Sequence, residues 1–302
     1  MPEKNNQNKK STCYSTIETL ISFLEGTGVG LLGRAAMWPS EWVYYQAAQK
    51  SNPLSYWTLY RVCLSPTMMR ELTTSFIKAG VKPTVGKSFS NAGVYKMMDL
   101  KFAHLNDQPL KKAFIATLFS APLEAYFTSP GEYEKIQRFH KTQNSYVLGK
   151  TERNRFRAAT FTRILGTRFM TISGIYQMKA WMNPFFSPST PDSVKNGITA
   201  TIAGGLVQVA NTPFINYHTF AALHLKMTFK ESVIAFIKEN TKVKDLERGL
   251  NGRGINCAGY YGLTFFVAKA IDESKVYNEN KSACIEKLSN LAESVFNRLK
   301  NR

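Results

Sequence analysis

Hydrophobic residues in this chain gather in long stretches that carry few or no charged side chains. The longest stretch runs from Asn196 to Leu225, where 30 residues contain no Asp, Glu, Lys or Arg, and Lys195 and Lys226 flank it. A helix needs about 20 mostly apolar residues to cross a bilayer, so this stretch is long enough to span one. The alternative is a buried central helix of a soluble protein, and the length favours the membrane interpretation.

Three shorter stretches of the same character lie elsewhere in the chain. Basic and polar segments such as residues 150–163 connect the apolar stretches. Basic loops beside apolar helices favour contact with anionic lipid headgroups. The three stretches are residues 26–38 with Arg34 as their one charge, residues 113–130 with Glu124, and residues 254–268 with none.

A proline preceded by two small residues occurs three times at the same spacing. The small residues lie nine and thirteen positions before each proline. Small residues four apart on a helix let another backbone approach closely, and a proline inside a helix kinks it. We therefore expect three kinked helices that pack through small residues. In chain order the sets are Gly26, Gly30 and Pro39; Thr117, Ala121 and Pro130; and Ala200, Gly204 and Pro213.

A second pattern alternates with the prolines. A basic residue lies six positions before the glycine of a Gly-x-Tyr triplet in three places, separated by 81 and 85 residues, while the prolines are 91 and 83 apart. One copy means little, but three copies in register indicate an internal threefold repeat. The copies are Lys87 with Gly93 and Tyr95, Arg168 with Gly174 and Tyr176, and Arg253 with Gly259 and Tyr261.

These repeats resemble the mitochondrial carrier family, whose odd-numbered helices each carry the motif P-x-[DE]-x-x-[KR]. The second copy, with Pro130, Glu132 and Lys135, matches that motif in full. Residues 76–87 look like the family's link into its second helix, and residues Leu246 to Gly249 look like the link into its sixth. The first copy keeps Pro39 and Glu41 but ends in Tyr44, and the third has Ile215 and His218 after Pro213.

The resemblance covers roughly residues 15–275. It implies an all-α membrane protein in which six transmembrane helices form three pseudo-threefold repeats, with short amphipathic helices on the matrix side. A polar helix over Ile285 to Leu299 is expected outside the barrel. The expected segments are a polar tail over residues 1–14, repeats over residues 15–107, 108–190 and 191–275, and the C-terminal polar helix within residues 276–302.

The same resemblance implies a closed matrix gate made of ion pairs between successive repeats. Glu41 is then expected to meet Lys135, and Glu132 to meet His218. The remaining pair, Ile215 with Tyr44, is not ionic. The plain alternative for both glutamates is a position on the helix surface, although charges inside a bilayer are expensive and are usually kept for function. The family's cytosolic gate is poorly preserved; its candidates are Asp99, Lys101, Lys179 and Lys269.

Four basic residues are candidate substrate contacts by the resemblance, namely Arg34, Lys87, Arg168 and Arg253. Four positive side chains around one cavity create a strong field for an anion. The planar fork of Arg suits phosphate or carboxylate, whereas Lys acts as a point charge. Arg34 favours a nucleotide such as ATP or ADP, and Arg168 favours a carboxylate. The alternative for each residue is a side chain that extends to lipid headgroups.

The expected function is therefore transport of a small anionic metabolite, most of all a nucleotide, by alternating access across the mitochondrial inner membrane. A monomer in a cardiolipin-containing bilayer is expected, with no cofactor, no metal and no nucleic-acid partner. Lys- and Asn-rich tails are compatible with a protein that an intracellular bacterium delivers into a host mitochondrion. The alternatives are a carrier of carboxylates or oxo-acids, and a carrier-fold scaffold without transport.

Composition adds a more distant alternative and excludes some chemistry. The chain has 302 residues and a net charge of +18, which a soluble, basic, all-α protein would use to bind nucleic acid, with Tyr and Phe as stacking platforms. The basic residues are spread rather than clustered, which disfavours that function. Neither cysteines nor histidines have metal-ligand spacing, and no phosphate-binding loop is present, so no enzyme is predicted. Those residues are Cys13, Cys63, Cys257, Cys284, His104, His140, His218 and His224.

Overall fold

The structure is a computed structural model that describes residues 3–47, 54–105, 108–139, 149–240 and 250–300. Helices and their short connections make up all of these residues, and none of them lies in a strand. The all-α prediction is therefore confirmed for the described chain. The link at Leu246 to Gly249 and the side chain of Asp99 lie outside the described parts.

Five long helices and one composite helical rod make up the body of the molecule. The long helices are α1 (Glu3–Ala47), α6 (Pro109–Phe139), α7 (Lys150–Met182), α8 (Asp192–Leu223) and α11 (Leu250–Glu273). The rod joins α3 (Pro66–Ser75), the π-helical turn η1 (Phe76–Gly80), α4 (Val81–Ser88), the π-helical turn η2 (Phe89–Gly93) and α5 (Val94–Lys101). The remaining elements are α2 (Tyr56–Cys63), the 3₁₀ turns η3 (Ala103–Leu105) and η4 (Asn183–Phe185), α9 (Phe229–Glu239) and α12 (Lys275–Lys300).

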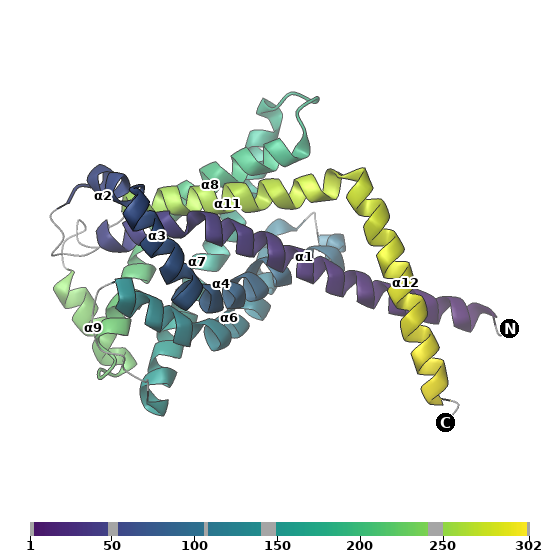
Figure 1. Ribbon diagram of the computed structural model, residues 1–302, viewed down its shortest axis with the longest axis horizontal. Helices are drawn as coiled ribbons and strands as arrows, with labels where there is room; N and C mark the ends of the chain where they lie inside the picture. The colour runs from purple at the N-terminus through teal and green to yellow at the C-terminus, as the bar shows by residue number, and fades with distance from the viewer. Residues whose placement is uncertain (1–2, 48–53, 106–107, 140–148, 241–249, 301–302) are drawn as a thin grey trace.

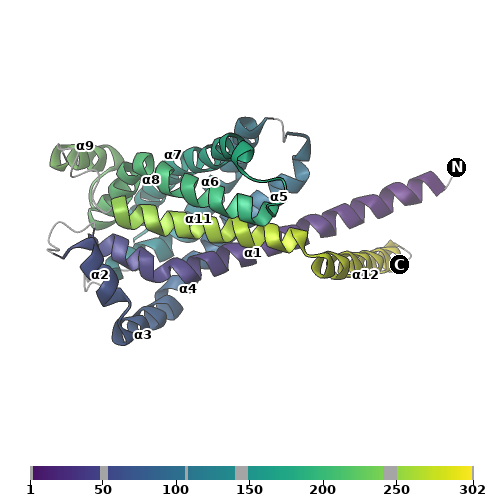
Figure 2. The same cartoon turned by 90° about the horizontal axis from the view of Figure 1, so that it is seen from above.

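These six segments form a closed ring in chain order. α1 packs against the rod, the rod against α6, α6 against α7, α7 against α8, α8 against α11, and α11 again against α1. In Figures 1 and 2, α2, α3 and α9 gather at one end of the ring, and both chain termini lie beyond the other end. The ring encloses an interior space that residues of all six segments line.

Small residues lie where the helices of the ring approach most closely. A Cβ added to Gly26 would lie 2.3 Å from the carbonyl oxygen of Ala92 on the rod, and one on Gly30 would lie 2.8 Å from the Ala92 Cβ. A Cβ on Gly204 would lie 2.9 Å from the ring of Tyr261 on α11. Ala121 and Ala200 are fully buried, and Thr117 is 2% exposed. The residues expected to pack helices together therefore do so.

Local signals in the sequence explain where several helices begin. The Ser55 hydroxyl accepts from the amide of Thr58 at the start of α2, and Ser65 does the same for α3, where Pro66 occupies the first turn. A capping box between Thr228 and Glu231 begins α9. Pro39 lies inside α1, Pro130 inside α6 and Pro213 inside α8. Helix α6 contains a second proline, Pro122.

Both ends of the chain are helical. The expected polar tail over residues 1–14 belongs to α1 from Glu3 onward, because no glycine or proline interrupts the first turns of that helix. The C-terminal helix expected over residues 276–302 is α12, which is amphipathic rather than polar throughout. Among the described helices, only α8 is long and apolar enough to meet a membrane-span criterion based on length and hydropathy.

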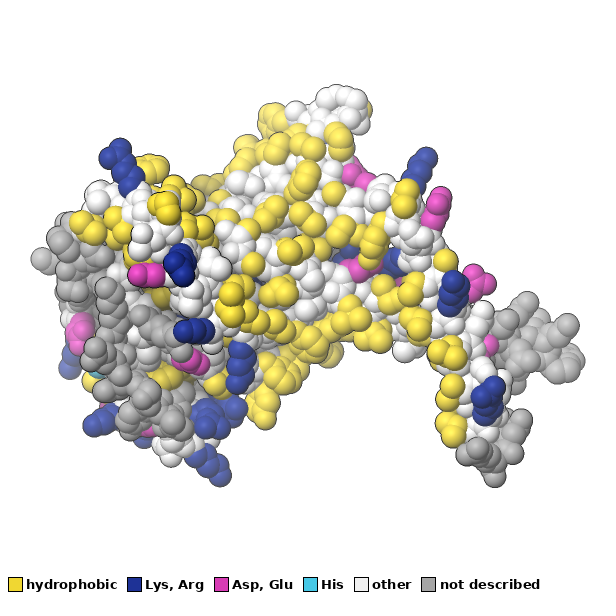
Figure 3. All heavy atoms as spheres, in the orientation of Figure 1, with side chains coloured by type: hydrophobic (Ala, Val, Ile, Leu, Met, Phe, Trp, Pro, Cys, Tyr) yellow, Lys and Arg dark blue, Asp and Glu magenta, His cyan; other side chains and the backbone are white. Residues whose placement is uncertain are grey.

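Charged and apolar side chains are distributed in an unusual way. Figure 3 shows apolar side chains in a band over the middle of the ring, between two ends that carry the charged ones. Large apolar side chains are exposed on the ring helices α1, α6, α8 and α11, among them Leu32, Phe114, Phe119, Ile202, Leu206 and Phe266. Several ionised side chains are buried inside instead: Lys87, Glu124, Glu132, Lys135 and Arg168. Soluble proteins show the reverse arrangement.

Candidate functional site

The basic residues that share a register in the sequence meet in one cavity inside the ring. Lys87 from α4, Arg168 from α7 and Arg253 from α11 line it together with Arg34 from α1. The cavity has a volume of about 100 Å³. All four candidate substrate contacts therefore lie in the same place, although their role as contacts stays a prediction.

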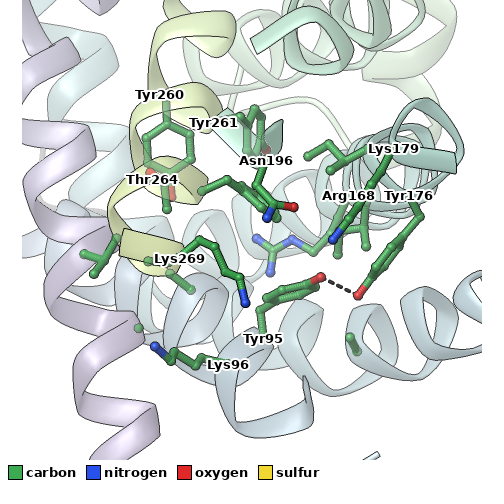
Figure 4. Close-up of a pocket in the computed structure, with 18 of the residues that line it drawn as sticks. Tyr95, Lys96, Arg168, Tyr176, Lys179, Asn196, Tyr260, Tyr261, Thr264 and Lys269 are labelled. Atoms are coloured by element: carbon green, nitrogen blue, oxygen red, sulfur yellow. Dashed lines mark hydrogen bonds between the residues drawn. The ribbon is translucent and has the colours of Figure 1, made fainter. Parts of the chain in front are cut away.

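The tyrosines of the three Gly-x-Tyr triplets also meet, in an adjoining chamber of about 270 Å³. Tyr95, Tyr176 and Tyr261 line this chamber (Figure 4), and the hydroxyls of Tyr95 and Tyr176 are hydrogen-bonded to each other. The cavity and the chamber adjoin each other, because Arg168, Tyr260 and Tyr261 line both. The internal repeat thus brings the three basic residues together in the cavity and the three tyrosines together in the chamber.

Two of the candidate cations are already paired with carboxylates. Lys87 Nζ lies 2.6 Å from Glu132 Oε1. Arg168 donates to Glu124, which is 2% exposed, and also reaches the carbonyl oxygen of Ser90 at 3.4 Å. Arg163 reaches the other oxygen of Glu124, also at 3.4 Å. Arg163 and the role of Glu124 were not predicted, although Glu124 is the one charge in residues 113–130.

The other two cations have no ion pair with a described carboxylate. The Arg34 guanidinium lies 4.4 Å from the ring centre of Tyr260, and its Nε has no hydrogen-bond partner among the described residues. The Arg253 guanidinium lies 5.3 Å from the ring centre of Tyr44, and its Nε donates to Gln208 at 2.8 Å. Aromatic faces stabilise these cations without neutralising them. Both guanidiniums remain available to an anion.

An ion-pair cluster closes the cavity at the end where α2, α3 and α9 gather. Lys135 Nζ lies 2.7 Å from Glu41 Oε1 and 2.7 Å from Glu132 Oε1, and the Lys135 side chain is 2% exposed. The expected pair between Glu41 and Lys135 is thus present. Aromatic rings cover the ammonium group, with Trp38 at 5.9 Å and Tyr45 at 5.5 Å. We call Glu41, Lys87, Glu132 and Lys135 the closed-end cluster.

The expected contact between Glu132 and His218 is wrong. Glu132 uses its carboxylate on Lys87 and Lys135, which are full charges with longer reach than an imidazole. His218 Nε2 instead hydrogen-bonds to the Thr160 hydroxyl at 3.0 Å, and its ring packs against Phe156. As expected, Ile215 and Tyr44 make no ionic contact, and both belong to the apolar core behind the cluster.

The opposite end combines paired and unpaired charges. Lys179 and Lys269 line the tyrosine chamber and point into it (Figure 4). Lys96 is paired there with Asp272 at 2.8 Å and with Glu25 at 3.3 Å. Lys101 lies outside the chamber and reaches the hydroxyl of Ser15 at 3.3 Å. We call this end, where the chamber lies, the open end; the lysines there that have no ion pair with a described carboxylate, Lys179 and Lys269, are positive.

The donor set of the interior suits anions rather than metal ions. Five basic side chains line the cavity beside two carboxylates, Glu41 and Glu124. No cluster of three or more His, Cys, Asp or Glu suitable for a metal ion occurs within the described chain. Guanidinium groups next to tyrosine rings can bind phosphate or carboxylate groups attached to an aromatic or apolar body.

Comparisons with known proteins identify no family for this chain. No family model matches the chain, and neither the curated proteins nor the solved structures that were searched contain a match.

Proposed function

We propose that the protein is a membrane-embedded transporter of a small anionic metabolite. The observation that carries this proposal is a ring of six helical segments with its charges inside and its apolar side chains outside. A bilayer is the solvent in which that inversion is favourable, because lipid tails accept apolar side chains while intramembrane charges face the interior. The ring itself supports six spans, although composition alone singles out α8.

An anion is the favoured cargo because positive charge dominates the interior. Arg34 and Arg253 have no carboxylate partner within the described residues, and Arg168 lines the same cavity. Unlike charges attract strongly where water is excluded and the effective dielectric constant is low. A bound anion would offset the repulsion among these side chains.

A nucleotide such as ATP or ADP fits the two spaces better than a compact anion. Its phosphates suit the guanidinium groups of the cavity. Its base suits the ring-lined chamber of Tyr95, Tyr176 and Tyr261, because aromatic rings stack on one another. Carboxylates or oxo-acids are the second candidate, since Arg168 already binds a carboxylate, that of Glu124.

Transport would follow alternating access. The ion-pair cluster at one end and the lined chamber at the other support one of the two states that such a mechanism requires. A ligand can drive the exchange only if it binds better in the occluded state than in either open state. By resemblance to mitochondrial carriers, we place the protein in the mitochondrial inner membrane as a monomer, with the closed-end cluster on the matrix side.

Uptake into liposomes tests the proposal directly. Purified protein is reconstituted, and labelled ATP, ADP, phosphate and oxo-acids are supplied with and without internal counter-substrate. We expect saturable nucleotide uptake that internal nucleotide stimulates. Uptake of oxo-acids alone would keep the transporter and change its substrate, whereas no uptake of any anion by inserted protein would favour a scaffold. Release of the protein from membranes by carbonate would favour the soluble, nucleic-acid-binding alternative.

A single substitution tests the site within that assay. Arg253→Ala removes a guanidinium that no described carboxylate neutralises, so we expect uptake to be abolished while membrane insertion is unchanged. Arg61→Ala, on the exposed face of α2, is the matched control and should transport normally. Undiminished uptake by the Arg253 variant would refute the assignment of the binding site.

A further inference from the structure

A stripe of apolar residues runs along α12, which lies outside the ring. Its members recur every three or four residues, as expected for one face of a helix. Charged residues such as Glu286, Lys287 and Glu293 occupy the opposite face. The stripe consists of Cys284, Ile285, Leu288, Leu291, Ala292, Val295, Phe296 and Leu299.

Contact with α1 covers only the first half of this stripe. Ile285 is 2% exposed and Ser289, one turn later, is also buried. Lys281 reaches both carboxylate oxygens of Glu25 on α1 at 3.0 Å, and the Tyr277 hydroxyl donates to the same carboxylate. These contacts fix the direction in which α12 leaves the ring.

The second half of the stripe is uncovered. Leu291 is 62% exposed, Phe296 63% and Leu299 67%, and Val295 is also exposed. Burying large apolar side chains is favourable in water, so four exposed neighbours in one row are unfavourable there. An apolar environment for this half of α12 is therefore needed.

The orientation of α12 indicates what that environment is. α12 runs across the long axis of the ring helices, just beyond the open end (Figure 1), and Figure 2 views it nearly end-on. In Figure 3 its apolar side chains face the apolar band of the ring, and its charged side chains face away. If the ring spans a bilayer, α12 lies parallel to the membrane surface with its apolar side toward the acyl chains.

We infer that the second half of α12, from Leu288 to Leu299, is an interfacial anchor that lies in the bilayer surface at the open end of the transporter. This inference rests on the proposed membrane embedding. Amphipathic helices of this kind bury their apolar face about 5–10 Å into the boundary between headgroups and acyl chains. The anchor is continuous with the mouth of the chamber, because Glu25 binds Lys281 of α12 and also Lys96 of the rod.

Fluorescence quenching in reconstituted full-length protein tests the anchor. The four native cysteines are replaced by Ala or Ser, and single variants Val295→Cys, Asn297→Cys and Leu206→Cys are labelled with an environment-sensitive fluorophore. Val295 lies on the apolar face of α12, Asn297 lies on its polar face, and Leu206 is an exposed residue of the α8 apolar band. Nitroxide groups on lipid acyl chains quench labels in the bilayer, and aqueous iodide quenches labels in water.

We expect lipid nitroxide to quench the labels at positions 295 and 206 about threefold more strongly than the label at position 297, with the reverse order for iodide. Quenching at 206 by lipid but at 295 by iodide would refute the anchor and leave the membrane embedding intact. Quenching at 206 by iodide would refute both. A label at 295 that is protected from both quenchers, with protection that falls on dilution, would show a second copy covering the stripe and would also refute the anchor.

Discussion

The two ends of the ring differ in how their charges are matched. At the closed end, Glu132 forms ion pairs with Lys87 and Lys135, Lys135 also donates to Glu41, and aromatic rings cover the Lys135 ammonium group. At the open end, Lys96 is paired with Asp272 and Glu25, whereas Lys179 and Lys269, which also line the chamber, have no ion pair with a described carboxylate. The two ends therefore differ in the unmatched lysines of the open end, since the closed-end cluster has as many carboxylates as ammonium groups.

The middle of the interior combines both arrangements. Glu124 forms ion pairs with Arg168 and Arg163, whereas Arg34 and Arg253 contact tyrosine rings and Arg253 also donates to Gln208. An incoming anion would therefore meet two guanidiniums without a described carboxylate partner and would compete with Glu124 for the other two. Substitutions at the closed end, in the middle of the interior and at the open end can therefore separate three effects: stability of the closed-end cluster, binding of the anion, and attraction of the anion to the chamber.

The largest effect is expected at the closed end. Glu132→Gln keeps the side-chain shape but leaves the ammonium groups of Lys87 and Lys135 buried beside a neutral amide. Removing one partner of a buried ion pair costs about 3–5 kcal/mol, so the free energy of unfolding should fall by that order. Denaturant-induced unfolding in detergent micelles, followed by tryptophan fluorescence, measures the change.

A neighbouring glutamate provides the control for that variant. Glu134 lies two positions later on α6 and is exposed, so Glu134→Gln should change stability by less than about 0.5 kcal/mol. Equal stability of the Glu132 and Glu134 variants would show that the closed-end cluster does not stabilise the closed state.

A smaller effect is expected in the middle of the interior. Glu124→Gln removes the carboxylate that occupies Arg168 and Arg163, so an added anion no longer competes with it. We expect ATP to bind about tenfold more tightly, which corresponds to roughly 1.4 kcal/mol. Calorimetric titration measures the affinity, with Glu134→Gln as the matched control on the same helix. Unchanged or weaker ATP binding would mean that Glu124 supports the site rather than competing for it.

The open end should show a still smaller, salt-dependent effect. Replacing both Lys179 and Lys269 by Ala lowers the positive field at the mouth, so initial nucleotide uptake should fall about threefold at low ionic strength. The difference should shrink as salt is added, because exposed charges are screened over about 8 Å at physiological ionic strength. Lys230→Ala, on α9 at the opposite end, is the control. A salt-independent loss would indicate direct ligand contact instead of attraction.

Much of this comparison was predictable from spacing in the sequence. Lys87, Arg168 and Arg253 recur in register with Gly-x-Tyr, and side chains in equivalent positions of a repeat face the same interior. Gly26, Gly30 and Gly204 were recognisable because close helix contacts exclude larger side chains. The pair of Glu41 with Lys135 followed from the motif that the carrier resemblance supplied.

Other features depend on geometry that the sequence does not carry. Two π-helical turns flank Lys87, and such turns change the direction in which later side chains face, compared with a regular α-helix. The pairing of Lys87 with Glu132 was therefore missed, and His218 was given a partner that it does not contact. The apolar stripe of α12 is visible in the sequence, but its direction relative to the ring is set by Glu25 and Lys281.

The smallest expected effect concerns α9, the surface helix beside the closed end. Hydrogen bonds from the backbone and side chain of Thr228 hold the pKa of Glu231 below its usual value. A carboxylate with a lowered folded-state pKa stabilises the fold at pH values above its unfolded pKa, and this contribution is lost as the pH falls through the folded pKa. Glu231→Gln removes it, so the variant should be slightly less stable than the natural protein at pH 7 and equally stable in acid. Thermal unfolding of both proteins across this pH range measures the difference, and Glu239→Gln at the other end of α9 is the control. A loss of stability in the Glu231 variant that persists in acid would mean that this side chain acts through packing rather than through its charge. The difference in charge matching between the two ends would then be confined to the helices of the ring and would not include the surface helix α9.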